Sequence, residues 1–309
     1  MAAVLDRIHV VNAIVALRDQ DALMTEARRR RRPGERLPGI LFALKDLVAT
    51  KVIRTTWGSP HFAEFVPGAD DLLAARLRQA GAILIGKNNT PEWGQGSHSF
   101  NPVYGANRNP YDTSRSAGGS SGGAAAALAT RMLFVADGSD MMSSLRDPAA
   151  FCNVYGFPPS FGLVPRSAGG ENFLSTLATD GPMGRNVEDV ARLHGWALPR
   201  HALRPRERGL CGPAGRRGAR ATHRLARRLG RSLSEGAGYP GARPSGAVGF
   251  EGLGTVVEDL PPPFPAEELW SAWITLRAMF SVGGPGALYE DEAERAKLNP
   301  SLSGRSSRG

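Results

Sequence analysis

Hydrophobic residues recur along this chain at helical spacing in some stretches and at strand-like spacing in others. Residues 4–30 repeat apolar positions near the helical period, which predicts one or two amphipathic helices. Residues 37–48 and 82–87 are short apolar runs typical of buried strands, and the helix predicted over 69–81 leads directly into the second run. A helix that feeds a fully apolar strand is typical of an α/β layer. We therefore expect a mixed, largely parallel central sheet flanked by helices.

The pattern resumes after a long polar stretch. Residues 88–123 are rich in Asn, Pro, Gly and Ser, and loops of this length in compact domains are usually functional or disordered. Beyond them the alanine-rich run at 124–128 predicts a helix, and residues 132–138 predict a strand. A further helix is expected over 184–196, with Asn186 as its N-cap.

The composition of the chain disfavours membrane, secreted and metal-binding proteins. No run reaches the ~18 apolar residues of a membrane span, and Met1–Asp6 lacks the basic start of a signal peptide. Cys152 and Cys211 lie far apart, and neither they nor the six histidines form a metal-binding pattern. We therefore expect a cytoplasmic protein with no membrane contact and no metal or other cofactor.

Positive charge is concentrated in one segment, residues 198–249. The chain has a net charge of +9, but the stretch from Arg200 to Phe250 holds twelve arginines against Glu207 and Glu235, so the rest is close to neutral. This distribution disfavours a nucleic-acid partner. The segment consists mainly of Arg, Gly, Ala and Pro, a composition that cannot easily form a core. We interpret it as disordered or as the product of a shifted reading frame, with a basic arm as the alternative.

The stretch SAGGSSGGAAAAL, residues 116–128, combines serines with glycines before a helix. Glycine permits backbone angles that other residues rarely adopt, and the loop ends at a helix N-terminus, where free N–H groups face outward. A flexible linker is the simplest alternative. The stretch also matches GxSxG at 118–122 and 119–123, but no strand precedes it, and outside the Arg-rich segment only His194 follows it. A nucleophile elbow of the α/β-hydrolase kind is therefore disfavoured.

Several further motifs accompany the glycine- and serine-rich stretch. The chain carries G-G-S-S-G-G at 118–123, G-S-D at 138–140 and S-L-R-D-P-A-A-F-C at 144–152, and PGILFALKDL stands upstream at 38–47. In this order the motifs resemble those of the amidase signature family of Ser–Ser–Lys hydrolases, and the upstream stretch resembles the strand with the family's K-D pair. Because so many matches occur in the family's order, the resemblance is specific.

The resemblance implies three catalytic residues. Ser144 would attack the carbonyl of an amide, and Ser120, following a cis peptide bond after Gly119, would relay the proton to Lys45. Lysine accepts a proton only if burial lowers its pKa from the usual ~10.4, and the apolar neighbours of Lys45 suit burial. Backbone N–H groups would bind the developing oxyanion, and they belong to Met141, Met142, Ser143 and Ser144.

The chain departs from the family pattern beside the nucleophile. Met142 and Ser143 stand where the family usually has glycines, and each adds a Cβ where the backbone can require glycine angles. Ser143 is also a competing nucleophile. We choose Ser144 because it directly precedes Leu-Arg and follows Ser120 by twenty-four residues, as in the family.

Other residues near these motifs are interpreted as structural. We expect Asp140 and Arg146 to hold the nucleophile turn by hydrogen bonds and an ion pair. Cys152 is expected in the core. Trp93 and Phe100 are equally consistent with packing and with lining a pocket.

Family members usually run longer than this chain, and their C-terminal part completes the sheet and covers the substrate. We therefore expect an amidase core at 1–197, the anomalous segment at 198–249, a partial continuation at 250–309 and an incomplete C-terminal part. The resemblance implies hydrolysis of a small-molecule carboxamide through an acyl-enzyme. The alternatives are the A-type component of a tRNA-dependent amidotransferase and a non-catalytic truncated remnant, and a homodimer stays open beside a monomer.

Overall fold

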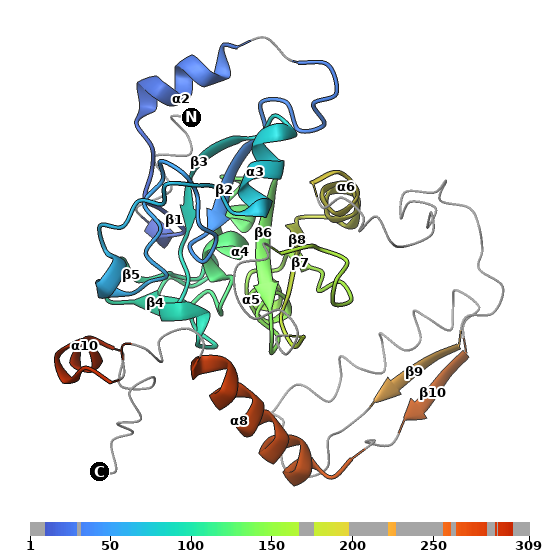
Figure 1. The fold of residues 1–309 in the computed structure, drawn as a ribbon. Coiled ribbons are helices and arrows are strands. Elements are labelled where there is room, and N and C mark those ends of the chain that lie inside the picture. Colours follow the sequence, from blue (N-terminus) through green and yellow to red (C-terminus); the bar gives the residue numbers. More distant parts are fainter. Residues whose placement is uncertain are drawn as a thin grey trace. The chain divides into compact units, whose positions relative to one another are not determined.

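The structure is a computed structural model that describes residues 10–29, 32–166, 176–197, 222–226, 256–260, 264–282, 288 and 290–298. The chain forms two compact units, the larger made of residues 1–212 and 285–309 and the smaller of residues 213–284. Helices and strands alternate through the larger unit (Figure 1), so the mixed α/β class predicted from the sequence is confirmed.

The first sheet of the larger unit forms where apolar runs predict strands. β2 (Leu41–Lys45) pairs in parallel with β3 (Ile83–Asn88), and β1 (Ile14–Val15) pairs antiparallel with the other edge of β3. α3 (Leu72–Gln79) lies in the crossover between β2 and β3, as a parallel pair requires. The side chain of Asp71 caps α3, and every residue of β3 is buried.

A second sheet follows the glycine- and serine-rich loop. β6 (Val135–Asp140) pairs antiparallel with β8 (Thr179–Gly184), and β7 (Tyr155–Gly156) pairs with the other edge of β8. The register sets Ser139 of β6 opposite Asp180 of β8. β6 also contacts β2 of the first sheet, so the two sheets adjoin.

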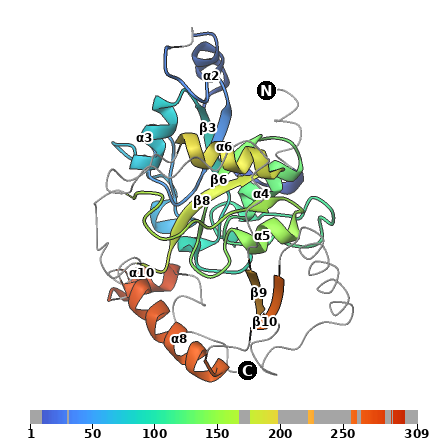
Figure 2. The ribbon, with the colours of Figure 1, turned by 90° about the vertical axis from the view of Figure 1, so that its right-hand side faces the viewer.

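Helices pack on both faces of these strands. α4 (Gly122–Ala129) contacts β1, β2, β3 and β6. α3 and α6 (Val187–Ala197) contact each other, and α6 lies against β8 (Figure 2). Because side chains alternate along a strand, Ala43 of β2 joins the cluster around α4, whereas Phe42 and Leu44 join the cluster around α3 and α6.

Shorter elements complete the larger unit. They are α2 (Gln20–Ala27), the 3₁₀ turns η1 (Pro60–Phe62) and η2 (Glu92–Gly94), the hairpin of β4 (Phe100–Asn101) and β5 (Gly105–Ala106), α5 (Arg146–Phe151) and α10 (Glu292–Lys297). α10 contacts η1, where His61 Nε2 lies 2.9 Å from Glu294 Oε2.

The structure differs from the sequence predictions in two respects. Residues 4–30 do not form continuous helix, because β1 pairs with β3 before α2 begins, and residues 1–9 lie outside the described part of the chain. The proportion of parallel pairing is also lower than expected, since β6 and β7 both pair antiparallel with β8. Apolar runs indicate that both faces of a strand are buried, whereas strand direction depends on the connections.

The smaller unit contains β9 (Thr222–Ala226), β10 (Val256–Leu260) and α8 (Ala266–Val282). β9 pairs in parallel with β10 and belongs to the Arg-rich segment. The rest of residues 198–249 lies outside the described residues, so the interpretation of that segment stays a prediction. None of the helices in the described part of the chain combines the length and the apolar character that a membrane span requires.

Candidate active site

The glycines of the loop at 116–123 allow close backbone packing beside α4. Gly118 has a φ of +79°, and a Cβ on Gly119 would lie 2.9 Å from the main-chain nitrogen of His98. A Cβ on Gly123 would overlap the main chain of Asn89. The peptide bond between Gly119 and Ser120 is cis, as the resemblance implied. The loop is therefore packed into the fold and is not a flexible linker.

Hydrogen bonds from neighbouring segments fix the backbone of Ser120. The Ser120 carbonyl accepts from Thr90 Oγ1 at 2.9 Å and from Ser99 Oγ at 3.3 Å. Ser99 Oγ in turn accepts from the N–H of Gly122, the first residue of α4. These bonds leave the Ser120 side chain directed at the end of β2.

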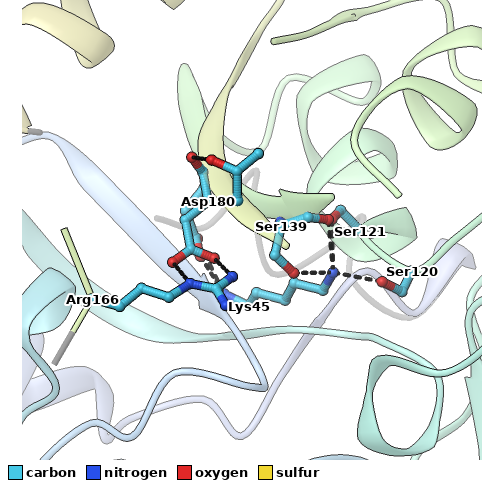
Figure 3. A network of polar contacts seen from close by, with 8 residues as sticks. Lys45, Ser120, Ser121, Ser139, Arg166 and Asp180 are labelled. Carbon is cyan, nitrogen blue, oxygen red and sulfur yellow. Dashed lines mark hydrogen bonds and ion pairs between the residues drawn. The ribbon is translucent and has the colours of Figure 1, made fainter. Parts of the chain in front are cut away.

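Lys45, the last residue of β2, extends its amine to this loop (Figure 3). Its side chain is buried, with 1% of the residue exposed. The amine nitrogen lies 2.7 Å from Ser120 Oγ, 2.9 Å from Ser121 Oγ and 2.9 Å from Ser139 Oγ. A neutral amine has two N–H donors and one lone pair, so it can donate to two of these hydroxyls and accept from the third.

Burial lowers the pKa of the Lys45 amine from 10.5 to about 7, because the charged form loses its hydration. The negative charges of Asp137, Asp180 and Asp140 act in the opposite direction. Near neutral pH a substantial fraction of the amine is therefore uncharged and able to take a proton.

Ser144 stands in the turn between β6 and α5, and Asp140 holds this turn. One carboxylate oxygen of Asp140 accepts from the N–H of Ser143 at 2.8 Å, and the other accepts from the N–H of Leu145 at 3.0 Å. The guanidinium of Arg146 pairs with both oxygens at 3.1 Å. Asp140 and Arg146 thus hold the turn in the way the sequence predicted.

The turn that contains Ser144 and the glycine loop are joined by a hydrogen bond between their backbones. The N–H of Ser121 donates to the carbonyl of Ser144 at 3.2 Å. Among the contacts of the described residues, no hydrogen bond links the hydroxyls of Ser120 and Ser144. The structure therefore brings Lys45 and Ser120 into direct contact and sets Ser144 beside them.

The backbone of the turn refines the expected oxyanion site. Ser143 has a φ of +74°, so one of the two residues in place of the family's glycines does adopt an angle that favours glycine. Its N–H is already donated to Asp140, which removes it from the free donors. In the described part of the chain, the N–H groups of Met141, Met142 and Ser144 have no acceptor.

Sequence reasoning missed three residues that contact Lys45. Ser121 and Ser139 contact its amine, and Asp137 accepts a hydrogen bond from its main-chain nitrogen at 3.1 Å. Asp137 and Ser139 are two residues apart on β6, so they project from one face of the strand. An aspartate within a stretch expected to be a buried strand was the signal that could have identified Asp137.

The surroundings of the other residues identified from the sequence mostly indicate structural roles. Cys152 is buried, and burial raises the pKa of its thiol to about 12. Trp93 stacks with Trp57 in an aromatic cluster that also includes Phe62, which favours packing, whereas Phe100 is half exposed. Within the described residues no group of His, Cys, Asp or Glu side chains could hold a metal ion.

The family model described as Amidase matches residues 2–207. This chain belongs to the amidase family. The motifs that carried the resemblance all lie within the matched range, and they include the three candidate catalytic residues.

Curated relatives of this chain include subunits of amidotransferases. The A-type subunit of glutamyl-tRNA(Gln) amidotransferase from Sulfurisphaera tokodaii is 40% identical over 185 residues, which cover 60% of this chain and 39% of that protein. The protein of the same description from Thermus thermophilus is 45% identical over 161 residues, which cover 52% of this chain and 34% of that protein. The chain thus spans well under half the length of these two relatives.

Solved structures of similar fold include hydrolases of the same family. A bacterial aryl acylamidase of the amidase signature family superimposes with a TM-score of 0.78 at 25% identity, covering 97% of this chain and 66% of that one. A crystal structure described as an amidase gives a TM-score of 0.77 at 26% identity, with 98% and 68% coverage.

Proposed function

We propose that this chain hydrolyses carboxamide C–N bonds, with Lys45, Ser120 and Ser144 as its catalytic residues. The observation that supports the proposal most directly is the buried Lys45 amine 2.7 Å from Ser120 Oγ. A lysine on the surface, or one paired with a carboxylate side chain, would stay charged and could not act as a base. Membership of the amidase family, and the likeness to solved structures described as an amidase and an aryl acylamidase, also support the proposal.

In the proposed reaction the neutral amine of Lys45 takes the proton of Ser120 Oγ as Ser120 takes that of Ser144. Ser144 Oγ bonds to the amide carbon, and an electron pair of the carbonyl moves to its oxygen. This oxygen would be stabilised by the free N–H groups of Met141, Met142 and Ser144. The contact between the serine hydroxyls would tighten when substrate binds, as catalytic hydrogen bonds often do.

The second half of the reaction returns the proton. The carbonyl re-forms, the C–N bond breaks, and the proton passes from Lys45 through Ser120 to the departing nitrogen. An acyl group remains on Ser144. Water then attacks this ester through the same relay, which releases a carboxylic acid and restores the Ser144 hydroxyl.

The test is covalent labelling with a serine-directed fluorophosphonate, followed by peptide mapping. We expect the label on Ser144 in the folded chain and its loss in Ser144→Ala. Ser143→Ala is the matched control, because it removes the neighbouring hydroxyl and should keep the label. Labelling of Ser143 in place of Ser144 would contradict the assignment of the nucleophile, and no labelling of folded protein would favour a non-catalytic remnant.

A second candidate is the A-type component of a tRNA-dependent amidotransferase. The identity of 40–45% to proteins of that description supports it, and such a role would require glutamine and a partner protein. Release of ammonia from glutamine only when a partner and an aminoacyl-tRNA are added would favour this candidate. Turnover of simple carboxamides by the chain alone would favour the amidase.

The proposal also covers the substrate of the chain, its partners and its location in the cell. A small-molecule amide remains the proposed substrate, without nucleic acid or membrane, and monomer and homodimer are both open. The cytoplasmic location expected from the cysteine usage also stays a prediction.

A further inference from the structure

β6 carries a buried carboxylate beside the base that the proposed reaction does not yet use. Asp137 is 5% exposed, and its two oxygens accept from the main-chain nitrogen of Lys45 at 3.1 and 3.2 Å. This main-chain nitrogen lies at the end of β2, where the Lys45 side chain begins. Asp137 therefore fixes the position from which the side chain reaches the serines.

Ser139 acts on the other end of the same side chain. It is two residues from Asp137 on β6, and its hydroxyl lies 2.9 Å from the Lys45 amine. One face of a single strand thus holds both the main chain and the amine of Lys45. We propose that Asp137 is a positioning residue, which anchors the main chain of Lys45 and supplies the buried negative charge that balances its ammonium form.

The proposal rests on the proposed function, because a balancing charge matters only if Lys45 gains a proton during the reaction. When Ser120 gives up its proton, a positive charge appears on a buried amine. A nearby carboxylate reduces the cost of that charge, as the aspartate of a Ser–His–Asp triad does for its imidazolium. Asp137 would do this without touching the substrate.

Other charged groups around the site have partners of their own. Asp180 on β8 forms a two-point ion pair with Arg166 at 2.7 and 2.8 Å (Figure 3). Asp140 is paired with Arg146. Lys87 on β3 acts on Asp137 from a distance and donates to Thr50 Oγ1 at 2.7 Å. Among the negative charges that raise the pKa of Lys45, that of Asp137 acts most strongly.

The chain offers a direct measurement, because it contains only four lysines, at positions 45, 51, 87 and 297. Labelling lysine with ¹³C at Cε and following the signals with pH gives the titration midpoint of each amine without any turnover. Lys51 and Lys297 are exposed, whereas Lys45 and Lys87 are buried. The signals of the two buried amines should therefore be distinguishable from those of the two exposed amines. Loss of one signal in Lys45→Met assigns the signal of interest.

We expect Asp137→Asn to lower the midpoint of Lys45 by roughly 1 unit, since asparagine keeps an acceptor for the main-chain N–H and removes the charge. The matched control is Asp46→Asn, a buried aspartate next to Lys45 in sequence, whose charge is the strongest of those that raise the pKa of Lys87. It should lower the midpoint of Lys87 and leave that of Lys45 in place. An unchanged Lys45 midpoint in Asp137→Asn, or an equal change in both variants, would overturn the proposal.

Two further measurements test the proposal, and the first does not need the Asp137→Asn variant. If Asp137→Asn does not fold, the pH titration curve of Lys45 in wild type should still have two steps, because Asp137 titrates in the same range and its charge acts on Lys45. A single step would overturn the proposal. The acid limb of the fluorophosphonate rate should move to lower pH in Asp137→Asn by the same amount. If wild type does not react but the midpoints move as expected, the proposed function fails and the catalytic role of Asp137 fails with it, although its charge does set the pKa of Lys45.

Discussion

A lysine amine inside a protein is a base only while burial keeps part of it neutral, and Lys45 meets that condition with uncharged partners at its amine. The three groups within 2.9 Å of the amine are serine hydroxyls. Hydroxyls can donate or accept, so they serve the neutral and the charged amine equally well. The carboxylate of Asp137 contacts the main chain instead.

This arrangement predicts how reactivity depends on pH. The pKa of Lys45 is lowered by burial to about 7, so the amine is charged below that value and neutral above it. The rate of fluorophosphonate labelling at Ser144 should therefore rise as the pH increases through about 7 and then level off. Lys45→Met, which is similar in length and uncharged, should lose this dependence together with most of the rate, on the order of 10²–10⁴-fold. A midpoint near 10 in wild type would contradict the assignment.

Ser143 supports a prediction about stability. Its φ of +74° is unfavourable for a residue with a Cβ, so Ser143→Gly should raise the free energy of unfolding by roughly 0.5–1 kcal/mol. Urea denaturation of both proteins measures the difference. Ser114→Gly, at an exposed turn position whose φ is not positive, is the control and should be neutral or destabilising.

At the scale of elements, periodicity and motif order were enough to predict individual strands, helices and helix caps from the sequence. The buried strands β2 and β3, the helix α4 and the Asn186 cap, whose side chain accepts from the N–H of Asp189, all follow from local pattern. The contacts of Ser121, Ser139 and Asp137 with Lys45 depend on how segments that are more than seventy residues apart in the sequence adjoin in the fold. No local pattern contains that information.

Two glycines in helices predict opposite effects of the same substitution. Gly123 lies in α4 against the main chain of Asn89, so Gly123→Ala should destabilise the fold by roughly 1–3 kcal/mol or more. Gly195 lies in α6 with no atom within 4 Å of a Cβ, so Gly195→Ala should stabilise it by roughly 0.5–1 kcal/mol. Urea midpoints of the two variants measure both effects. Equal effects would mean that the packing of α4 on β3 is looser than described.

At the scale of the whole molecule, the described residues concentrate in the part that the family model matches. The described residues of the candidate active site lie between positions 45 and 144, within the larger unit. Composition alone marked the Arg-rich segment as anomalous, because twelve arginines with few apolar residues cannot easily form a core.

The reading-frame interpretation of residues 198–249 makes a prediction of its own. We expect a different frame of the gene across this stretch to encode sequence that resembles the amidase family. Sequencing the gene and translating all frames is the measurement, and the stretch encoding residues 82–138 is the control, since its present frame already gives the family motifs. If no other frame resembles the family, the segment is a genuine basic insertion.

The two-sided character of β6 has a consequence for how this segment can evolve. Asp137 and Ser139, at odd-numbered positions, face Lys45, whereas Asp140 holds the turn that contains Ser144. The two sides of the strand therefore support two different halves of the candidate site, the Lys45 half and the Ser144 half. A single substitution alters one half. Inserting or deleting one residue between Asp137 and Asp140 would exchange the two sides and disable both halves at once. Descendants of this chain should therefore keep the length of β6 constant.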